Sequence, residues 1–185
     1  ICPLSKFGPF CYLNHSTCDA PENPCKNGGT CIPIDDRINR TGFTCLCSEN
    51  FSGERCDTAK NRIDIQFDAS LIPRHSVILL HFITAYPDAE HERTTILKKI
   101  LVHQQSLIVH FAQPFHFLFL QIPHQAYYLL VVRERYLKSE SIVTSVQEEQ
   151  RCPPIDKLTD LQLVKQPYLR RAKMYPWLCR RHRAL

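Results

Sequence analysis

Six of the ten cysteines in this 185-residue chain lie between Cys18 and Cys56. They stand at positions 18, 25, 31, 45, 47 and 56, so that six, five, thirteen, one and eight residues separate them. A segment this short buries too little apolar surface to offset its chain entropy, and it needs covalent cross-links to fold. Spacing alone does not choose among the many pairings that six cysteines allow.

The cysteines are open to two interpretations, disulfides or metal ligands. Zinc sites typically contain Cys-x-x-Cys or mixed Cys and His groups, and this chain has no Cys-x-x-Cys. An even number of cysteines with sequons nearby favours an oxidising, secretory compartment, so we expect no metal. The chain opens without a signal peptide, and we interpret it as a mature product or a piece of a longer protein.

The cysteine pattern of residues 18–56 resembles that of the epidermal growth factor-like (EGF-like) module. Three stretches carry the resemblance: Cys25-Lys-Asn-Gly-Gly-Thr-Cys31, Cys45-Leu-Cys47 and Cys47-Ser-Glu-Asn-Phe-Ser-Gly-Glu-Arg-Cys56. The resemblance implies the disulfides Cys18–Cys31, Cys25–Cys45 and Cys47–Cys56. Each of these is expected to stabilise the module by about 2–4 kcal/mol, mainly by restricting the unfolded chain.

Small residues in the module have backbone or modification roles. We expect Gly28 and Gly29 to take positive φ in a turn, and Gly53 to do so in the last loop. The family usually has a further glycine where this chain has Asn50, and asparagine tolerates the left-handed conformation next best. Thr30 matches the family's pattern for an O-fucose acceptor, although a plain turn threonine is an equal alternative.

Residues 2–11 repeat part of the module. Cys2 and Cys11 have the same spacing as Cys47 and Cys56, with a glycine, Gly8, at the same offset. We therefore interpret residues 1–17 as the remnant of a preceding EGF-like module. The alternative is an isolated disulfide loop, and in either case Cys2 is expected to pair with Cys11.

Calcium is not expected to bind the module. Calcium-binding members carry an acidic or amide pair before the first cysteine, whereas no acidic residue directly precedes Cys18. Asp35 and Asp36 are adjacent, and two carboxylates do not make a cage of six to eight oxygens. Three sequons predict surface positions for N-glycans in a secreted chain, at Asn14, Asn39 and Asn50.

Residues 61–150 follow a short polar linker at 57–61 and match no family that we recognise. Arg62–Asp68 alternates, with Ile63, Ile65 and Phe67 on one face. Further strand-like runs span residues 76–84, 95–103, 106–112, 115–122, 126–133 and 141–147. Turn signals between them predict an antiparallel β-sandwich-like domain, with a hairpin at His103–Ser106. The longest uncharged stretch, Ile100–Val132, contains too many polar residues for a membrane span.

The tail at residues 151–185 carries nine basic and two acidic side chains, a net of +7. Cys152-Pro-Pro and the spacing of the leucines predict short helices. Cys152 and Cys179 remain once the other cysteines are paired, so we expect a disulfide between them, with partners outside this chain as the alternative. Acidic extracellular glycans or anionic lipid headgroups suit the charge of the tail, and a solvated helical face is the plainer interpretation. Nucleic acid does not fit the disulfide-rich context.

Catalysis and metal binding have weak support. His103, His110, His116 and His124 lie on different predicted strands, with no sign that they converge. Glu90 and Glu92, a candidate acid pair for sugar hydrolysis, fall in a predicted loop between strands, where we expect them to be solvated. The usual nucleophile, metalloprotease and phosphate-loop motifs are absent, so we expect no enzyme and no cofactor.

The sequence therefore predicts a mainly β, extracellular or cell-surface mosaic protein that binds a protein partner, in adhesion for example. A membrane span elsewhere in a longer protein is compatible with this reading. A receptor-activating growth factor is the alternative, because Gly53-Glu-Arg-Cys56 matches such ligands, but Asn61 stands where they carry leucine and the first loop is one residue short. A secreted enzyme based on residues 61–150 is the third class.

Overall fold

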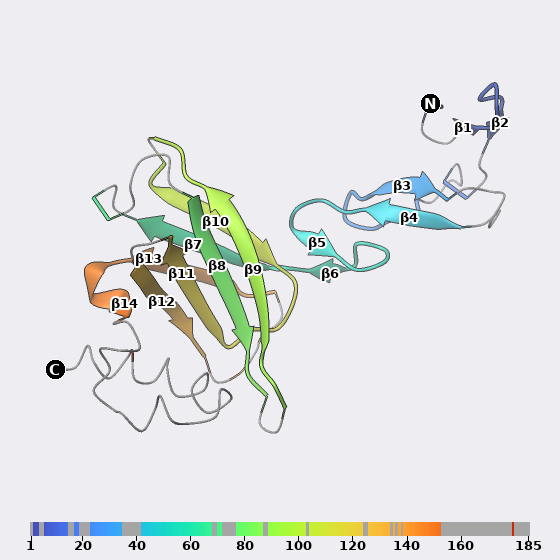
Figure 1. Cartoon of the computed structure of the whole chain (residues 1–185). Helices are drawn as coiled ribbons and strands as arrows, with labels where there is room; N and C mark the ends of the chain where they lie inside the picture. The colour runs from blue at the N-terminus through green and yellow to red at the C-terminus, as the bar shows by residue number, and fades with distance from the viewer. Residues whose placement is uncertain are drawn as a thin grey trace. The chain divides into compact units, whose positions relative to one another are not determined.

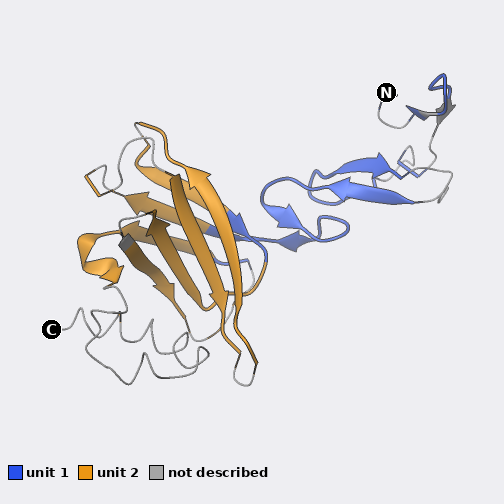
Figure 2. Cartoon of the chain, in the orientation of Figure 1, with its two compact units in different colours: residues 1–62, 110–112, 138–140 blue, residues 63–109, 113–137, 141–185 orange. Residues whose placement is uncertain are grey.

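The computed structural model describes residues 2–3, 6–14, 17–18, 23–34, 42–67, 70–71, 77–86, 89–102, 104–123, 126–133, 135, 137, 139–152 and 179 (Figure 1). The chain is mainly β and divides into two compact units (Figure 2). The first unit comprises residues 1–62, 110–112 and 138–140, and the second comprises residues 63–109, 113–137 and 141–185.

Short antiparallel ladders and disulfides build the first unit. The ladders pair β1 (Lys6–Phe7) with β2 (Leu13–Asn14), β3 (Thr30–Pro33) with β4 (Phe43–Leu46), and β5 (Phe51–Ser52) with β6 (Thr58–Ala59). Among the described residues up to position 60, Cys25 and Cys56 are the only buried apolar side chains. The expected linker at 57–61 is structured, because it contains β6 and the start of β7.

Two sheets build the β region that follows. The three-stranded sheet has the order β10 (Ser106–Phe111), β7 (Asn61–Phe67) and β13 (Ser141–Val146). The five-stranded sheet has the order β14 (Arg151–Cys152), β12 (Ala126–Val132), β11 (Phe117–Ile122), β8 (Val77–Thr84) and β9 (Glu92–Lys99). One 3-10 turn, η1 (Glu148–Gln150), joins β13 to β14.

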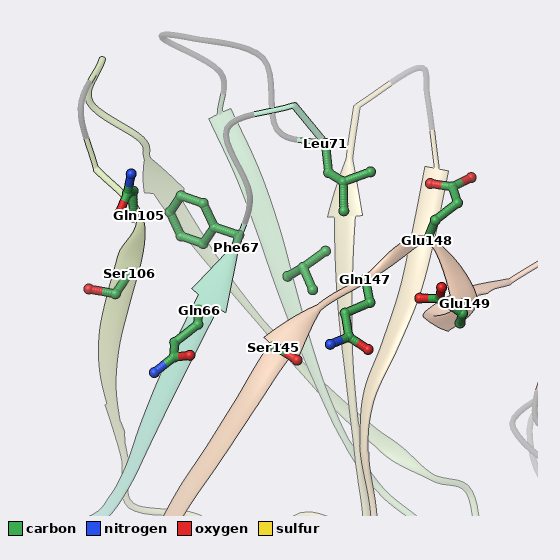
Figure 3. Close-up of a pocket in the computed structure, with 10 residues that line it drawn as sticks. Gln66, Phe67, Leu71, Gln105, Ser106, Ser145, Gln147, Glu148 and Glu149 are labelled. Carbon is green, nitrogen blue, oxygen red and sulfur yellow. The ribbon is translucent and has the colours of Figure 1, made fainter.

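The central strand β7 follows the predicted alternation, since Ile63, Ile65 and Phe67 are buried. Its pairing with β13 departs from the expected antiparallel arrangement. The Arg62 N–H donates to the Glu140 carbonyl at 2.9 Å, so both strands begin at the same edge, and Figure 3 shows them running in the same direction. Almost the whole β region separates them in sequence, which leaves room for the long crossover that a parallel pair requires.

Part of the five-stranded sheet is covered on both faces. Ile78, Leu80 and Phe82 of β8 fill one face together with alternate residues of β11. On the other face Phe119 and Leu129 pack against the Cys152–Cys179 disulfide. Strands covered on both sides read as continuous apolar runs, and β11 with part of β12 accounts in this way for the second half of the uncharged Ile100–Val132 stretch.

Two predicted elements were placed wrongly. β9 and β10 belong to different sheets, so the connection at His103–Ser106 is a crossing between sheets and not a hairpin. β9 spans residues 92–99, whereas we expected a strand at 95–103, because the chain turns where the Gln104 N–H donates to the Leu101 carbonyl.

The predicted helices of the tail lie at residues 153–178, outside the described part of the chain. The adjoining residues Arg151 and Cys152 form β14, the edge strand of the five-stranded sheet, beside Tyr127 and Tyr128 of β12. Within the described ranges, the structure has no helix of the length and apolar character needed to cross a membrane.

Candidate functional site

The loop closed by Cys47 and Cys56 has a defined backbone geometry. Gly53 has φ 95° and Cys56 has φ 58°, and the Cys56 N–H donates to the Gly53 carbonyl at 3.3 Å. The loop carries β5 into β6, with Phe51 opposite Ala59. A positive φ is easiest for glycine, so the expectation for Gly53 is confirmed.

The loop closed by Cys2 and Cys11 has the same geometry. Gly8 has φ 88° and Cys11 has φ 56°, and the Cys11 N–H donates to the Gly8 carbonyl at 3.2 Å. It carries β1 into β2, with Lys6 opposite Asn14. Two segments of the chain thus share spacing, torsion angles and strand register.

The turn at residues 27–29 differs in part from the positive φ angles that we expected at Gly28 and Gly29. Asn27 and Gly28 have φ 50° and 75°, whereas Gly29 has no positive φ. Gly29 is required by space, because a Cβ there would lie 2.7 Å from the Cys56 Sγ. Asn50 likewise has no positive φ among the described residues, so it does not act as a left-handed stand-in for glycine.

The turn is tied to the segment before the last cysteine. The Asn27 Nδ2 donates to the Cys56 carbonyl at 2.8 Å, and the Lys26 N–H donates to the Arg55 carbonyl at 2.8 Å. The Arg55 guanidinium lies over the Phe43 ring at 5.7 Å, within the range of a cation–π contact. Arg55, shared with receptor-activating ligands, therefore has a defined position.

The β3–β4 hairpin has one face on the disulfides and one on solvent. Cys31 lies opposite Cys45, and these residues form the disulfides Cys18–Cys31 and Cys25–Cys45. Thr30 lies opposite Leu46 on the other face, where Thr30 is exposed and Leu46 is 63% exposed. We call Thr30, Thr44 and Leu46 the hairpin face. An exposed leucine beside two threonines suits contact with another protein.

The predicted glycosylation sites are only partly described. Thr30 and Asn50 are exposed, and Asn14 lies in β2. Asn39 lies outside the described residues. Asp35 and Asp36, the acidic pair considered for calcium, also lie outside them.

Within the described residues, the catalytic and metal candidates do not come together in a site. His103 and His124 lie outside the described residues, and within the described ranges no three His, Cys, Asp or Glu side chains form a metal-ligand group. Glu92 begins β9, not a loop as expected, and its carboxylate accepts from the Tyr86 hydroxyl at 3.2 Å. Glu90 is exposed outside the strand.

His116 is held in place by hydrogen bonds with backbone groups of neighbouring segments. Its Nδ1 accepts from the Ala85 N–H at 3.1 Å, and its carbonyl accepts from the Arg133 N–H at 3.0 Å. Burial first, and the positive charge of Arg133 second, lower the pKa of His116 below the usual 6.5. The Arg133 guanidinium lies 3.8 Å from the Phe115 ring centre and its Nε donates to the Phe115 carbonyl.

His81 was not among the sequence candidates. Its Nε2 lies 2.8 Å from the Gln121 Oε1 and its Nδ1 lies 3.0 Å from the Thr95 Oγ1, and its ring stacks on Tyr127. The amide oxygen of Gln121 can only accept, so the His81 Nε2–H donates to it, and with this tautomer Nδ1 accepts from the Thr95 hydroxyl. The sequence did contain a signal for this polar cluster, because His81 and Gln121 each interrupt an apolar run, in β8 and β11 respectively.

All ten cysteines are paired, including Cys152 with Cys179. Both of these cysteines are buried, and they pack against Phe119 and Leu129 with Phe117 and Ile83 alongside. The disulfide therefore covers apolar side chains on the five-stranded sheet.

Comparisons with known proteins match the cysteine-rich region. The family model of the EGF-like domain matches residues 14–55. Protein eyes shut homolog of Pongo abelii is 35% identical over 57 residues, which is 31% of this chain and 2% of that protein. Cubilin homolog of Caenorhabditis elegans is 33% identical over 69 residues, 37% of this chain and 2% of that protein. Protein lin-12 of the same organism is 32% identical over 68 residues, 33% of this chain and 4% of that protein.

The chain spans only 2% to 4% of the length of these relatives. No solved structure matches it. The matched residues include the β3–β4 ladder and the disulfides Cys18–Cys31 and Cys25–Cys45, and they end one residue before Cys56. Residues 14–55 are therefore an EGF-like domain, in a chain that belongs outside the cell or on its surface.

Proposed function

We propose that this chain is part of an extracellular mosaic protein that binds another protein through its EGF-like domain, in adhesion and not in catalysis. The observation that carries the proposal is the hairpin face. Leu46 is 63% exposed on this face, and the disulfides lie on the opposite face of the hairpin. A large apolar side chain held out to solvent on a cross-linked element can act as an anchor in a pocket of a partner.

The domain organisation belongs to the same proposal. The shared geometry of the two disulfide loops supports residues 1–17 as the last loop of a preceding EGF-like module. Residues 61–150 are proposed to form a sandwich-like domain from the two sheets, because each sheet has one face lined by buried apolar side chains. Residues 151–185 are proposed as a disulfide-closed, helical and basic segment.

Glycans are proposed at the exposed residues Asn50 and Thr30, and at Asn14 and Asn39. Thr30 lies on the hairpin face opposite Leu46, so a sugar there would change the surface offered to a partner. Mass analysis before and after enzymatic deglycosylation of chain secreted from animal cells tests this, and an unchanged mass would contradict it.

Binding through the hairpin face is tested with the whole chain. Fluorescently labelled chain is applied to intact animal cells, and Leu46→Ser is expected to reduce saturable binding at least about fivefold, since central apolar anchors dominate interfaces. Leu101→Ser is the matched control, because Leu101 is 62% exposed and lies outside the module. Equal binding by the two variants would contradict a role for the hairpin face.

The growth-factor alternative has one specific observation in its favour, the defined position of Arg55 over Phe43. Receptor phosphorylation on cells treated with the chain separates the two functions. A signal abolished by Arg55→Ala would favour a ligand, and binding without phosphorylation would favour the adhesion module.

A further inference from the structure

A cavity of about 910 Å³ opens at one end of the three-stranded sheet, where β7 and β13 end and β10 begins (Figure 3). All of its described lining residues belong to the second unit. Its volume lies in the range of sites that hold small molecules. The binding function proposed for the EGF-like domain does not involve it.

Three apolar residues contribute to the lining of the cavity. Phe67 and Val146, the last residues of β7 and β13, are 6% and 2% exposed, so most of the apolar surface comes from the half-buried Leu71 in the adjoining turn, which is labelled in Figure 3. A small hydrocarbon surface within a mostly polar lining favours a ligand that has an apolar face as well as polar groups.

The walls carry neutral polar groups. Gln66, Gln105 and Gln147 supply amides, and Ser106 and Ser145 supply hydroxyls. Amides and hydroxyls both donate and accept hydrogen bonds. Among the described residues, the side chains of Gln66, Gln105, Ser106 and Ser145 have no hydrogen-bond partner, so their bonding capacity is available to a ligand.

The described lining of the cavity disfavours anionic ligands. No Lys, Arg or His is among its described lining residues, and Glu148 and Glu149 stand at one side. Glu148 is paired with Arg151 at 2.9 Å.

The position of the cavity does not suit an extended peptide. An extended peptide adds to a sheet along a free edge, whereas this cavity lies across strand ends and offers side chains in place of a backbone ladder.

We infer that this cavity binds an uncharged saccharide. A sugar ring carries hydroxyls that donate and accept around its rim, which match the amide and hydroxyl walls. Its C–H surface can pack on Leu71, the most exposed apolar residue of the lining. The extracellular location of the chain brings it into contact with such ligands.

The inference is tested by nuclear magnetic resonance of the ¹⁵N-labelled whole chain. Chitotriose, cellotriose and mannotriose are titrated separately, with a heparin-derived tetrasaccharide and a lysine-rich peptide as competing ligand classes. At least one uncharged trisaccharide is expected to shift amide signals at residues 66–67, 105–106 and 145–149. Gln66→Ala is expected to weaken that binding about fivefold, and Ser145→Ala about threefold.

Ser141→Ala is the matched control for Ser145→Ala, because Ser141 is exposed at the other end of β13. It is expected to leave the affinity unchanged, and unaltered spectra outside the cavity show that each variant is folded. No shift with any of the three trisaccharides at about 10 mM, shifts that persist unchanged in Gln66→Ala, or shifts with only the anionic saccharide or the peptide would each overturn the inference.

Discussion

The two units reach stability by different means. In the first unit four disulfides close loops over sequence separations of 9 to 20 residues, and the described residues up to position 60 bury few apolar side chains. In the second unit, buried Ile, Leu and Phe side chains line both sheets, and one disulfide covers an outer face. The first unit restricts its unfolded chain, whereas the second stabilises its folded state by burial.

The difference teaches where each unit tolerates change. The stability of a unit held by cross-links should fall most when a disulfide is removed or when a larger side chain crowds one. The stability of a unit held by an apolar core should fall most when a buried side chain is truncated and leaves a cavity. Variants in one unit should therefore leave the other one folded.

The largest effect is expected from Phe82→Ala. The Phe82 ring packs edge-on against Phe115, with ring centres 5.1 Å apart, and both are buried. Truncation of a buried phenylalanine costs about 3–5 kcal/mol in unfolding free energy. Urea unfolding followed by circular dichroism measures the loss, and Val143→Ala, at an exposed site, is expected to change it by less than about 0.5 kcal/mol. A similar cost for both variants would refute a core-based unit.

Replacement of Cys25 and Cys45 together by serine tests the cross-linked unit. Loss of a native disulfide from a small module costs about 2–5 kcal/mol and often abolishes folding. Amide signals of β3 and β4 are expected to collapse to unfolded positions, while those of β8 and β11 stay in place. If the β3 and β4 signals kept their dispersion, the module would not depend on the Cys25–Cys45 disulfide for its fold.

Replacement of Cys152 and Cys179 by serine sharpens the comparison, because this bridge lies in the unit that has its own core. The entropy of a loop with a separation of 27 residues predicts a loss of about 3–4 kcal/mol, yet the sheets are expected to remain folded with a lower Tm. Calorimetry gives the Tm, and non-reducing peptide mapping checks the bridge. Free thiols at both positions in the unaltered chain would exclude this bridge.

Gly29→Ala and Gly28→Ala form a matched pair within the module. The Gly29 Cβ would meet the Cys56 Sγ at 2.7 Å, and overpacking of this kind costs about 1–3 kcal/mol. Gly28 has open space and φ 75°, so alanine there is expected to cost about 1 kcal/mol. Thermal unfolding ranks the two variants, and the reverse order would show that backbone conformation outweighs contact with the disulfide.

The smallest expected effect is a pH dependence from His116. Its pKa is lower in the folded chain than the usual 6.5 of the unfolded chain, so the unfolded chain binds the proton first as the pH falls. Stability is therefore full above about pH 6.5 and declines below it. Urea midpoints at pH 7.5 and 5.0 should differ less in His116→Gln than in the unaltered chain; an equal difference would assign the dependence to other groups.

The module could be read from its cysteines because spacing and glycine positions are local signals. The strands of the β region were also found, since their apolar runs are long. Their partners were not, because the parallel pair of β7 and β13 and the crossing between β9 and β10 depend on contacts far apart in sequence. His81 and the cavity at Phe67 were missed for the same reason: their neighbours come from several strands.

The position of β7 in the sequence determines the order in which parts of the chain can fold, because the chain is synthesised from its N-terminus. The disulfide loops that precede β7 can close as soon as they are made, whereas Asn61 receives its hydrogen bond from Glu140, 79 residues later. Until β13 arrives, one edge of a strand rich in isoleucine is open to wrong partners. Such long-range pairing slows folding and exposes the chain to aggregation. Secretory chaperones would therefore be needed for the β region longer than for the module.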